Sequence, residues 1–201
     1  MRKLKHQTFW VVVALAAVVC VPSLISAATL VRHQNLAEMC DEAAMIYRGK
    51  VLDISTGSMA LAGGELPVVN FKLEVSESFK GEFVQKGERR YAEFTVAGSF
   101  KPVLNQVGDY ARLNTLPAPP ALRVGEEYLL LTNAPNEHGL SNTIGMAQGC
   151  FHISGIGKAE VVRNGADNAG LFKGMPEQGL ASQGALSYAE IAQIIRDDVA
   201  Q

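Results

Sequence analysis

The signature motifs of several enzyme classes are missing from this 201-residue chain. No GxSxG nucleophile elbow, no GxxxxGKS/T phosphate loop and no HExxH zinc motif occurs. The adjacent carboxylates Asp41-Glu42 and Glu126-Glu127 would point apart in a helix or a strand, so neither pair is a natural acid–base couple. We therefore predict a protein that is not an enzyme and that uses no cofactor.

Neither sign of charge dominates the composition. The chain has 18 basic and 20 acidic residues. Because the first 28 residues hold three bases and no acid, the chain from Thr29 onward has a net charge of -5. Affinity for nucleic acid comes from neutralising phosphates, so this composition argues against a nucleic-acid partner. Hydrophobic residues make up 48% of the chain, which suffices for the core of one domain.

Residues 1–28 have the three parts of a secretory signal peptide. A basic start leads into an uninterrupted apolar run over 9–21, which Pro22 ends. Small residues at Ser26 and Ala28 then predict cleavage between Ala28 and Thr29. The basic residues of the start are Arg2, Lys3 and Lys5.

Two alternatives to a cleaved signal peptide are a membrane anchor and a lipidated cysteine. The apolar run has 13 residues, whereas a membrane-spanning helix needs roughly 20. Cys20 follows Val19, which is larger than the small residue usual before a lipidated cysteine. We expect an exported protein, located in a periplasm or outside the cell, with no membrane span after cleavage.

Removal of residues 1–28 leaves two cysteines, Cys40 and Cys150. An even number of cysteines in an exported chain favours a disulfide between them. Two buried free thiols are the alternative. A metal site is disfavoured because no CxxC or HxxxH spacing occurs, and the histidines of the mature chain are scattered. These are His33, His138 and His152.

Short strands dominate the predicted secondary structure. Asn35 and Glu38 form a capping box that starts a short helix, with Cys40 on its buried side. The clearest strand signal is the alternation of apolar and polar residues over 69–80, which Gly81 ends. Further strands are expected over 45–54 with a turn at Gly57, then over 91–96, 127–132, 144–154 and 159–163. We predict an all-β fold, a small antiparallel barrel over 29–163.

Three further segments complete the predicted organisation. The irregular stretch 98–125 holds four prolines and is long enough for a binding loop, although a covering loop is the alternative. Residues 164–186 are rich in Gly, Asn and Gln and are interpreted as a linker. Residues 187–201 begin with a capping box at Ser187 and continue as an amphipathic helix that docks on the barrel.

The order of these elements resembles the netrin-like module, an OB-type β-barrel that includes the tissue inhibitors of metalloproteinases, and a set of exported bacterial proteins of the same layout. The family's inhibitors bind the protease zinc through an N-terminal cysteine, where this chain has Thr29. The resemblance therefore implies the fold rather than that contact. The residues that carry it are Cys40-Asp41-Glu42-Ala43, 46–51, 71–75, 78–81, 124–130 and Gln148-Gly149-Cys150-Phe151.

From these observations we expect an exported, non-catalytic binding module. Its barrel face and the 98–125 loop would hold a protein or glycan partner. The alternative, implied by the resemblance, is a metalloprotease inhibitor. An enzyme whose site assembles only in the folded state is less favoured.

Overall fold

The structure is a computed structural model that describes residues 32–61, 64–100, 103–104, 110–111, 119–175 and 183–200. The predicted signal peptide, with its cleavage site between Ala28 and Thr29, lies outside the described residues, as do residues 101–102, 105–109 and 112–118 of the 98–125 loop. The chain from Arg32 onward forms one compact unit. Within the described residues, no helix has the length and apolarity to cross a membrane.

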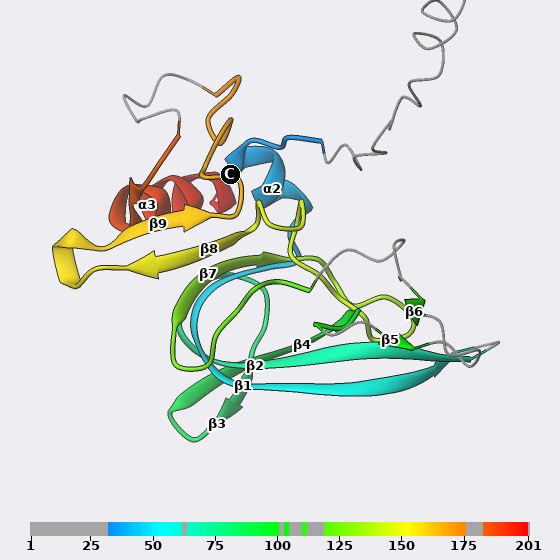
Figure 1. Cartoon of the computed structure of the whole chain (residues 1–201). Coiled ribbons are helices and arrows are strands. Elements are labelled where there is room, and N and C mark those ends of the chain that lie inside the picture. Colours follow the sequence, from blue (N-terminus) through cyan, green and yellow to red (C-terminus); the bar gives the residue numbers. More distant parts are fainter. Residues whose placement is uncertain are drawn as a thin grey trace, which may run out of the picture. The chain divides into compact units, whose positions relative to one another are not determined.

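This unit is built on one large sheet, with helix α2 (Leu36–Glu42) before it and helix α3 (Tyr188–Val199) after it in sequence (Figure 1). A separate pair, β5 (Val103–Leu104) and β6 (Tyr110–Ala111), and the 3-10 helix η1 (Gly157–Ala159) are the smaller elements. The strands of the large sheet are β1 (Met45–Leu61), β2 (Gly64–Lys80), β3 (Val84–Lys86), β4 (Arg89–Ala97), β7 (Glu127–Thr132), β8 (Cys150–Ser154), β9 (Val161–Asn164) and β10 (Leu186–Ser187).

The eight strands follow the order β10-β9-β8-β7-β1-β2-β4-β3, and each neighbouring pair is antiparallel. The all-β prediction, with a short helix near each end of the mature chain, is confirmed. The strands β10 and β3 stand at the two edges of the sheet, and closure into a barrel is not shown. Isolated bridges join Thr95 of β4 to Leu140 and Thr132 of β7 to Thr143, so the connection between β7 and β8 borders both strands.

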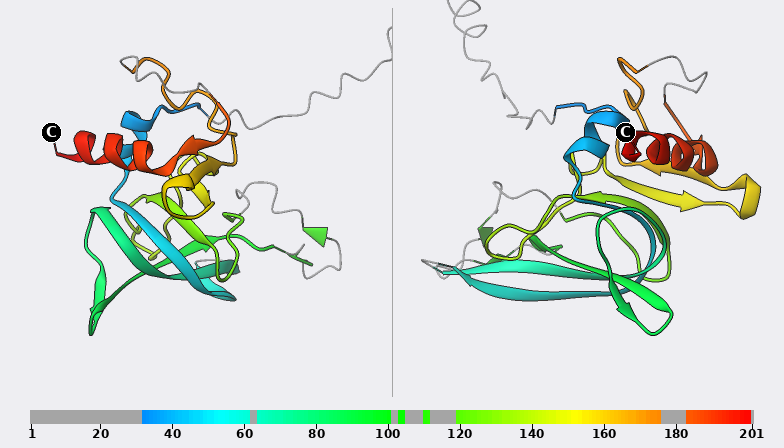
Figure 2. Two further views of the ribbon diagram at one scale, coloured as in Figure 1. Left: turned by 90° about the vertical axis from the view of Figure 1, so that its left-hand side faces the viewer. Right: turned by 180° about the vertical axis from the view of Figure 1, so that it is seen from behind.

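The strands β1 and β2 form a hairpin, and β1 curves strongly along its length (Figure 2). The pairing of β1 with β2 shifts register at three places, and such bulges bend a strand. Gly49 lies in the curved part, where a Cβ atom would sit only 3.2 Å from the carbonyl oxygen of Glu74 and from Leu73 Cβ. The curve lets β1 pair with β7 over Met45 to Lys50 while the rest of β1 pairs with β2 alone.

Two apolar cores lie on opposite faces of β7. Leu129 and Leu131 belong to one core, which we call the helix-side core, and Tyr128 and Leu130 belong to the other, the hairpin-side core. Alternate residues of a strand point to opposite faces, so β7 is buried on both sides. This burial explains its continuous apolar sequence, which sequence patterning predicted with the correct bounds.

The helix-side core holds the two helices against the sheet. Asn35 and Glu38 form the predicted capping box of α2, and Ile191 and Ile195 of α3 are fully buried. The predicted docking of the C-terminal helix is therefore confirmed. The core contains Leu36, Met39, Cys40, Ala43, Ile46, Leu129, Leu131, Ile144, Phe151, Ile153, Val162, Leu171, Leu186, Tyr188, Ile191, Ala192 and Ile195.

The hairpin-side core lies between β7 and the curved β1–β2–β4 layer. Phe71 and Phe94 stack in it with ring centres 4.9 Å apart. Its buried members are Tyr47, Val51, Val69, Phe71, Leu73, Val75, Ala92, Phe94, Val96, Leu122, Tyr128 and Leu130.

Three expectations differ from the structure. The turn predicted at Gly57 is absent, because β1 continues to Leu61. Residues 144–149 are turns rather than strand, and β8 begins at Cys150. The described part of the predicted linker is packed, since Leu171 and Asn168 are buried.

Asn168 anchors the described part of this glycine-rich segment. Its side chain donates to the carbonyl oxygens of Val162, at 2.9 Å, and Gly184, at 2.7 Å. It also accepts from the Asn164 backbone amide at 2.9 Å. Hydrogen bonds of a buried side chain therefore hold the described part of a segment whose composition resembles that of a flexible linker.

Candidate functional site

The outer part of the sheet, β8 and β9, has one face that the hairpin-side core does not cover. The other face carries Phe151, Ile153 and Val162, which are buried in the helix-side core. The residues that alternate with them, His152 and Arg163, have side chains that are 46% and 59% exposed. Figures 1 and 2 show α2 and α3 at one end of the described unit and the β1–β2 hairpin at the other.

A cavity of about 500 Å³ lies over this uncovered face. This volume falls within the range of small-molecule pockets, roughly 300–1,000 Å³. The apolar part of its lining comes from the end of the 98–125 stretch, from the turns before β8 and from β8 itself. These residues are Pro119, Pro120, Ala121, Met146, Ala147 and Cys150.

A row of polar side chains crosses the three strands at the rim of this pocket. Tyr128 of β7 stands opposite His152 of β8, and His152 stands opposite Arg163 of β9. The rings of Tyr128 and His152 lie 5.3 Å apart, centre to centre. The other polar lining residues are Asn142, Thr143 and Asn164.

Glu126 organises one end of this row. The Tyr128 hydroxyl donates to Glu126 Oε2 at 2.8 Å, and His152 Nε2 lies 3.2 Å from the same oxygen. The Tyr128 oxygen also accepts from the Arg123 backbone amide at 3.2 Å. The hydrogen bond from Tyr128, with the nearby His152 and Arg123, lowers the pKa of Glu126, so this carboxylate is ionised at neutral pH.

Arg163 has its own carboxylate partner outside the pocket. Its Nε atom lies 3.1 Å from Oδ1 of Asp167. Neither Glu126 nor Asp167 lines the pocket. Each of the two basic side chains at the rim, His152 and Arg163, therefore has a carboxylate neighbour, and neither carboxylate belongs to the part of the lining that the structure describes.

Cys150 lies beside the hairpin-side core and lines the same pocket. Burial raises the pKa of this thiol to about 12. A thiol of that pKa is protonated at neutral pH and is a poor nucleophile. The residue is therefore part of the apolar lining and not an activated cysteine.

The predicted Cys40–Cys150 disulfide is not formed in the structure, in which both residues are free thiols. Cys40 is buried in the helix-side core, whereas Cys150 pairs with Leu130 and lies on the hairpin side of the sheet. Because the sheet separates the two side chains, a bond between their sulfurs would require one of them to change face. This corrects the expectation drawn from the even cysteine count.

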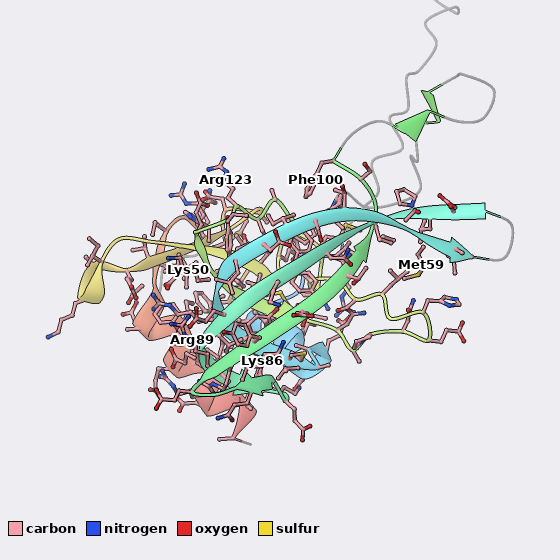
Figure 3. The ribbon with its side chains drawn as sticks, turned by 90° about the horizontal axis from the view of Figure 1, so that it is seen from below. Lys50, Met59, Lys86, Arg89, Phe100 and Arg123 are labelled. Carbon is pink, nitrogen blue, oxygen red and sulfur yellow. The ribbon has the colours of Figure 1, made fainter. Side chains whose placement is uncertain are left out.

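The outer face of the β1–β2–β4 layer is a solvated surface of mixed charge. Lys72 pairs with Glu93 at 2.9 Å, and Arg89 lies 3.5 Å from Glu74. Figure 3 shows Lys86 and Arg89 at one end of this face and Met59 toward the other. Alternating ion pairs make this face a weaker candidate for a binding site than the pocket.

No group of three or more potential metal ligands is found among the residues that the structure describes. Sequence reasoning treated His152 as a surface or packing residue and did not select Tyr128 or Arg163. The alternation of β8 was a usable signal, because Cys150 and His152 are two positions apart and must share a face. Their proximity to Tyr128 and Arg163 depends on strand register, which no local pattern contains.

No family model matches this chain, and neither a curated protein nor a solved structure matches it. The netrin-like resemblance therefore stays a prediction.

Proposed function

We propose that the mature chain is an exported, non-catalytic binding protein, and that its partner inserts an apolar group into the pocket over β8 and β9. The observation that carries this proposal is the combination of an apolar cavity of about 500 Å³ with the polar row Tyr128–His152–Arg163 at its rim. Ligand sites in proteins commonly join an apolar lining to a few convergent polar groups. The export half of the proposal rests on residues 1–28 alone.

A binding role agrees better with this geometry than catalysis does. The Tyr128 hydroxyl is engaged by Glu126 and by a backbone amide, and burial, followed by the hydrogen bond to Glu126, raises its pKa. The Cys150 thiol is protonated at neutral pH. Neither group is therefore prepared to act as a base or a nucleophile.

The apolar lining favours a protein partner over a glycan. A glycan presents many hydroxyl groups, and each hydroxyl placed against Pro119, Pro120 or Met146 would lose hydrogen bonds to water. An apolar side chain has no such cost. The inhibitor alternative gains no support from any match to a known protein.

A pocket-filling variant tests the proposal. Ala121 is exposed and lines the pocket, so Ala121→Phe is expected to fill the cavity without disturbing either core. The mature wild-type protein and the variant would each be immobilised and used to capture partners from envelope extract. We expect the wild type to retain a partner that Ala121→Phe loses.

A matched control separates loss of the pocket from an unspecific surface effect. Ala60 is also exposed but lies near the tip of the β1–β2 hairpin, so Ala60→Phe adds the same ring away from the pocket. Equal capture by the wild type and both variants would refute the pocket as the binding site.

A further inference from the structure

The pocket over β8 and β9 has a one-sided charge. Among the described residues that line it, Arg163 and His152 carry nitrogen groups able to donate to an anion, and no aspartate or glutamate contributes to the lining. The other ionisable lining residues, Tyr128 and Cys150, have raised pKa values and are neutral at neutral pH. Among the lining residues that the structure describes, an anionic group at the rim would therefore meet no negatively charged side chain, although Glu126, outside the lining, lies 3.2 Å from His152 Nε2.

The two donors are held side by side by strand register. His152 and Arg163 are directly opposite each other on β8 and β9, which places their Cβ atoms about 5 Å apart. Each of the two also has a carboxylate neighbour outside the lining: Glu126 Oε2 lies 3.2 Å from His152 Nε2, and Asp167 Oδ1 lies 3.1 Å from Arg163 Nε.

The guanidinium of Arg163 retains donors for a ligand. Its ion pair with Asp167 engages Nε. The terminal Nη atoms form part of the planar fork that binds carboxylates through two parallel hydrogen bonds. Because the Arg163 side chain is 59% exposed, a ligand reaching the rim from solvent meets this fork directly.

The depth of the pocket requires an apolar group next to the anion. Met146 and Ala147 line one side and Pro119 and Pro120 another, while the donors lie at the exposed rim. A ligand that fills the site thus places its apolar part inside and its negative charge at the edge. The side-chain amide of Asn142 and the hydroxyl of Thr143 also line the pocket, and both groups can form hydrogen bonds with a peptide backbone.

We infer that the pocket binds the carboxyl terminus of a partner polypeptide, with an apolar last side chain inside the cavity and the free α-carboxylate against Arg163 and His152. This inference rests on the proposed binding function and adds the chemistry of the partner. The rest of the bound polypeptide leaves the pocket at the exposed rim, so the pocket accommodates the carboxyl terminus of a polypeptide of any length.

Paired peptides test this assignment on the folded mature protein. Short acetylated peptides ending in leucine, valine or phenylalanine are prepared as the free acid and as the amide, and binding is measured by calorimetry. We expect the free acids to bind at least tenfold more tightly than the amides, the scale expected for loss of one charge-assisted hydrogen-bonding group. Octanoate, an apolar acid without a peptide group, should bind more weakly than the peptide acids.

Variants locate the carboxylate. Arg163→Gln should weaken the peptide acids about tenfold and leave the amides unchanged. Asp167→Asn removes the competing carboxylate while keeping Arg163, so it should leave binding of the acids unchanged or strengthen it. Arg89→Gln, on the outer face of β4, is the matched control for loss of an exposed arginine and should change nothing.

The outcomes separate this inference from the proposed function. Equal binding of acids and amides, both lost in Ala121→Phe, would overturn the carboxylate assignment and leave the pocket as a binding site. Octanoate binding as tightly as the peptide acids would overturn the polypeptide as the source. Absence of binding by every peptide would also overturn the inference, and capture of a partner by the wild type but not by Ala121→Phe would then still support the proposed function.

Discussion

Arg48 of β1 donates two hydrogen bonds to Glu160, through Nη1 at 2.8 Å and Nη2 at 2.9 Å, although 112 residues separate them in the chain. Its Nε atom also donates to Glu127 at 2.9 Å, and its guanidinium lies 4.7 Å from the centre of the Tyr188 ring. Because the Arg48 side chain is only 17% exposed, solvent screens these contacts weakly. One cation thus joins β1, β7, the segment before β9 and helix α3.

Replacement of Arg48 should destabilise the fold strongly. Arg48→Met keeps an apolar stem but leaves Glu127 and Glu160 without their cation, and we expect the free energy of unfolding to fall by about 3 kcal/mol. Urea unfolding followed by circular dichroism measures this change. Arg89→Met is the control, since Arg89 has one 3.5 Å contact to Glu74 and a 67% exposed side chain, and it should cost less than about 0.5 kcal/mol. Similar losses in both variants would contradict the role assigned to Arg48.

Acid should weaken the same network. Hydrogen bonds from Arg48 lower the pKa of Glu160. Burial by itself would raise the pKa of Glu77, but hydrogen bonds from Tyr188 and Arg196 outweigh it, so this pKa is also lowered. A carboxylate with a lowered pKa in the folded state stabilises the fold fully above its ordinary pKa of 4.5, and the contribution is lost as the pH falls through the lowered value.

We therefore expect the free energy of unfolding to decrease as the pH is lowered below about 4.5. Asp198 has the opposite effect on the pH dependence of stability, because burial and the nearby Asp41 raise its pKa. Unfolding curves of the wild type and Glu160→Gln at a series of pH values give the measurement. The variant should lose less stability on acidification, and parallel pH profiles for the two proteins would contradict the prediction.

Both thiols of the mature chain should react slowly with alkylating reagents in the folded protein and should not be joined in a disulfide. Burial raises the pKa of Cys40 and of Cys150 to about 12 in each case, and nearby Asp198 adds to the effect at Cys40. We expect slow alkylation by iodoacetamide at neutral pH in the folded protein and rapid alkylation of both after unfolding without reductant. Intact mass spectrometry counts the labels. A gain of two hydrogens on reduction would instead demonstrate a disulfide.

Asn168 should be essential for packing of the segment after β9. Asn168 is itself fully buried, and Asn168→Ala removes its two hydrogen bonds to the carbonyl oxygens of Val162 and Gly184 and the one it accepts from the Asn164 amide, so we expect a loss of about 3 kcal/mol. Denaturant unfolding measures the loss. Gln193→Ala, on the exposed face of α3, is the control and should change stability by less than about 0.5 kcal/mol. A small loss of stability in Asn168→Ala would contradict this prediction, because it would mean that water replaces the side chain as the hydrogen-bond donor to the two carbonyl oxygens.

The elements that sequence patterning located correctly have signals contained within a few residues. The capping box of Asn35 and Glu38 lies within one helical turn, and Gly81, with a φ of 93°, ends β2 in a conformation that glycine adopts readily. The missed features depend on distant partners. Gly57 by itself predicts a turn, but in the structure it pairs with Val68 inside the long β1–β2 hairpin.

The candidate site shows the same division. Cys150 was selected from the sequence for a disulfide, and the sheet instead places it at the lining of a pocket, with its sulfur on the opposite side from Cys40. His152 and Arg163 carry no motif, and they face one another only because β8 and β9 pair in one register. Shifting that register by one residue would turn one of the two toward the helix-side core.

Local chemistry thus sufficed for the all-β class, the caps of both helices and the amphipathic stripe of α3, because each depends on contacts or periodicities within a short stretch of chain. Tertiary structure alone decided which face of β8 borders the pocket, that the two cysteines lie apart, and that Tyr128, His152 and Arg163 form one row. These relationships arise from the pairing of strands and the curvature of β1, which are set by packing between residues far apart in sequence.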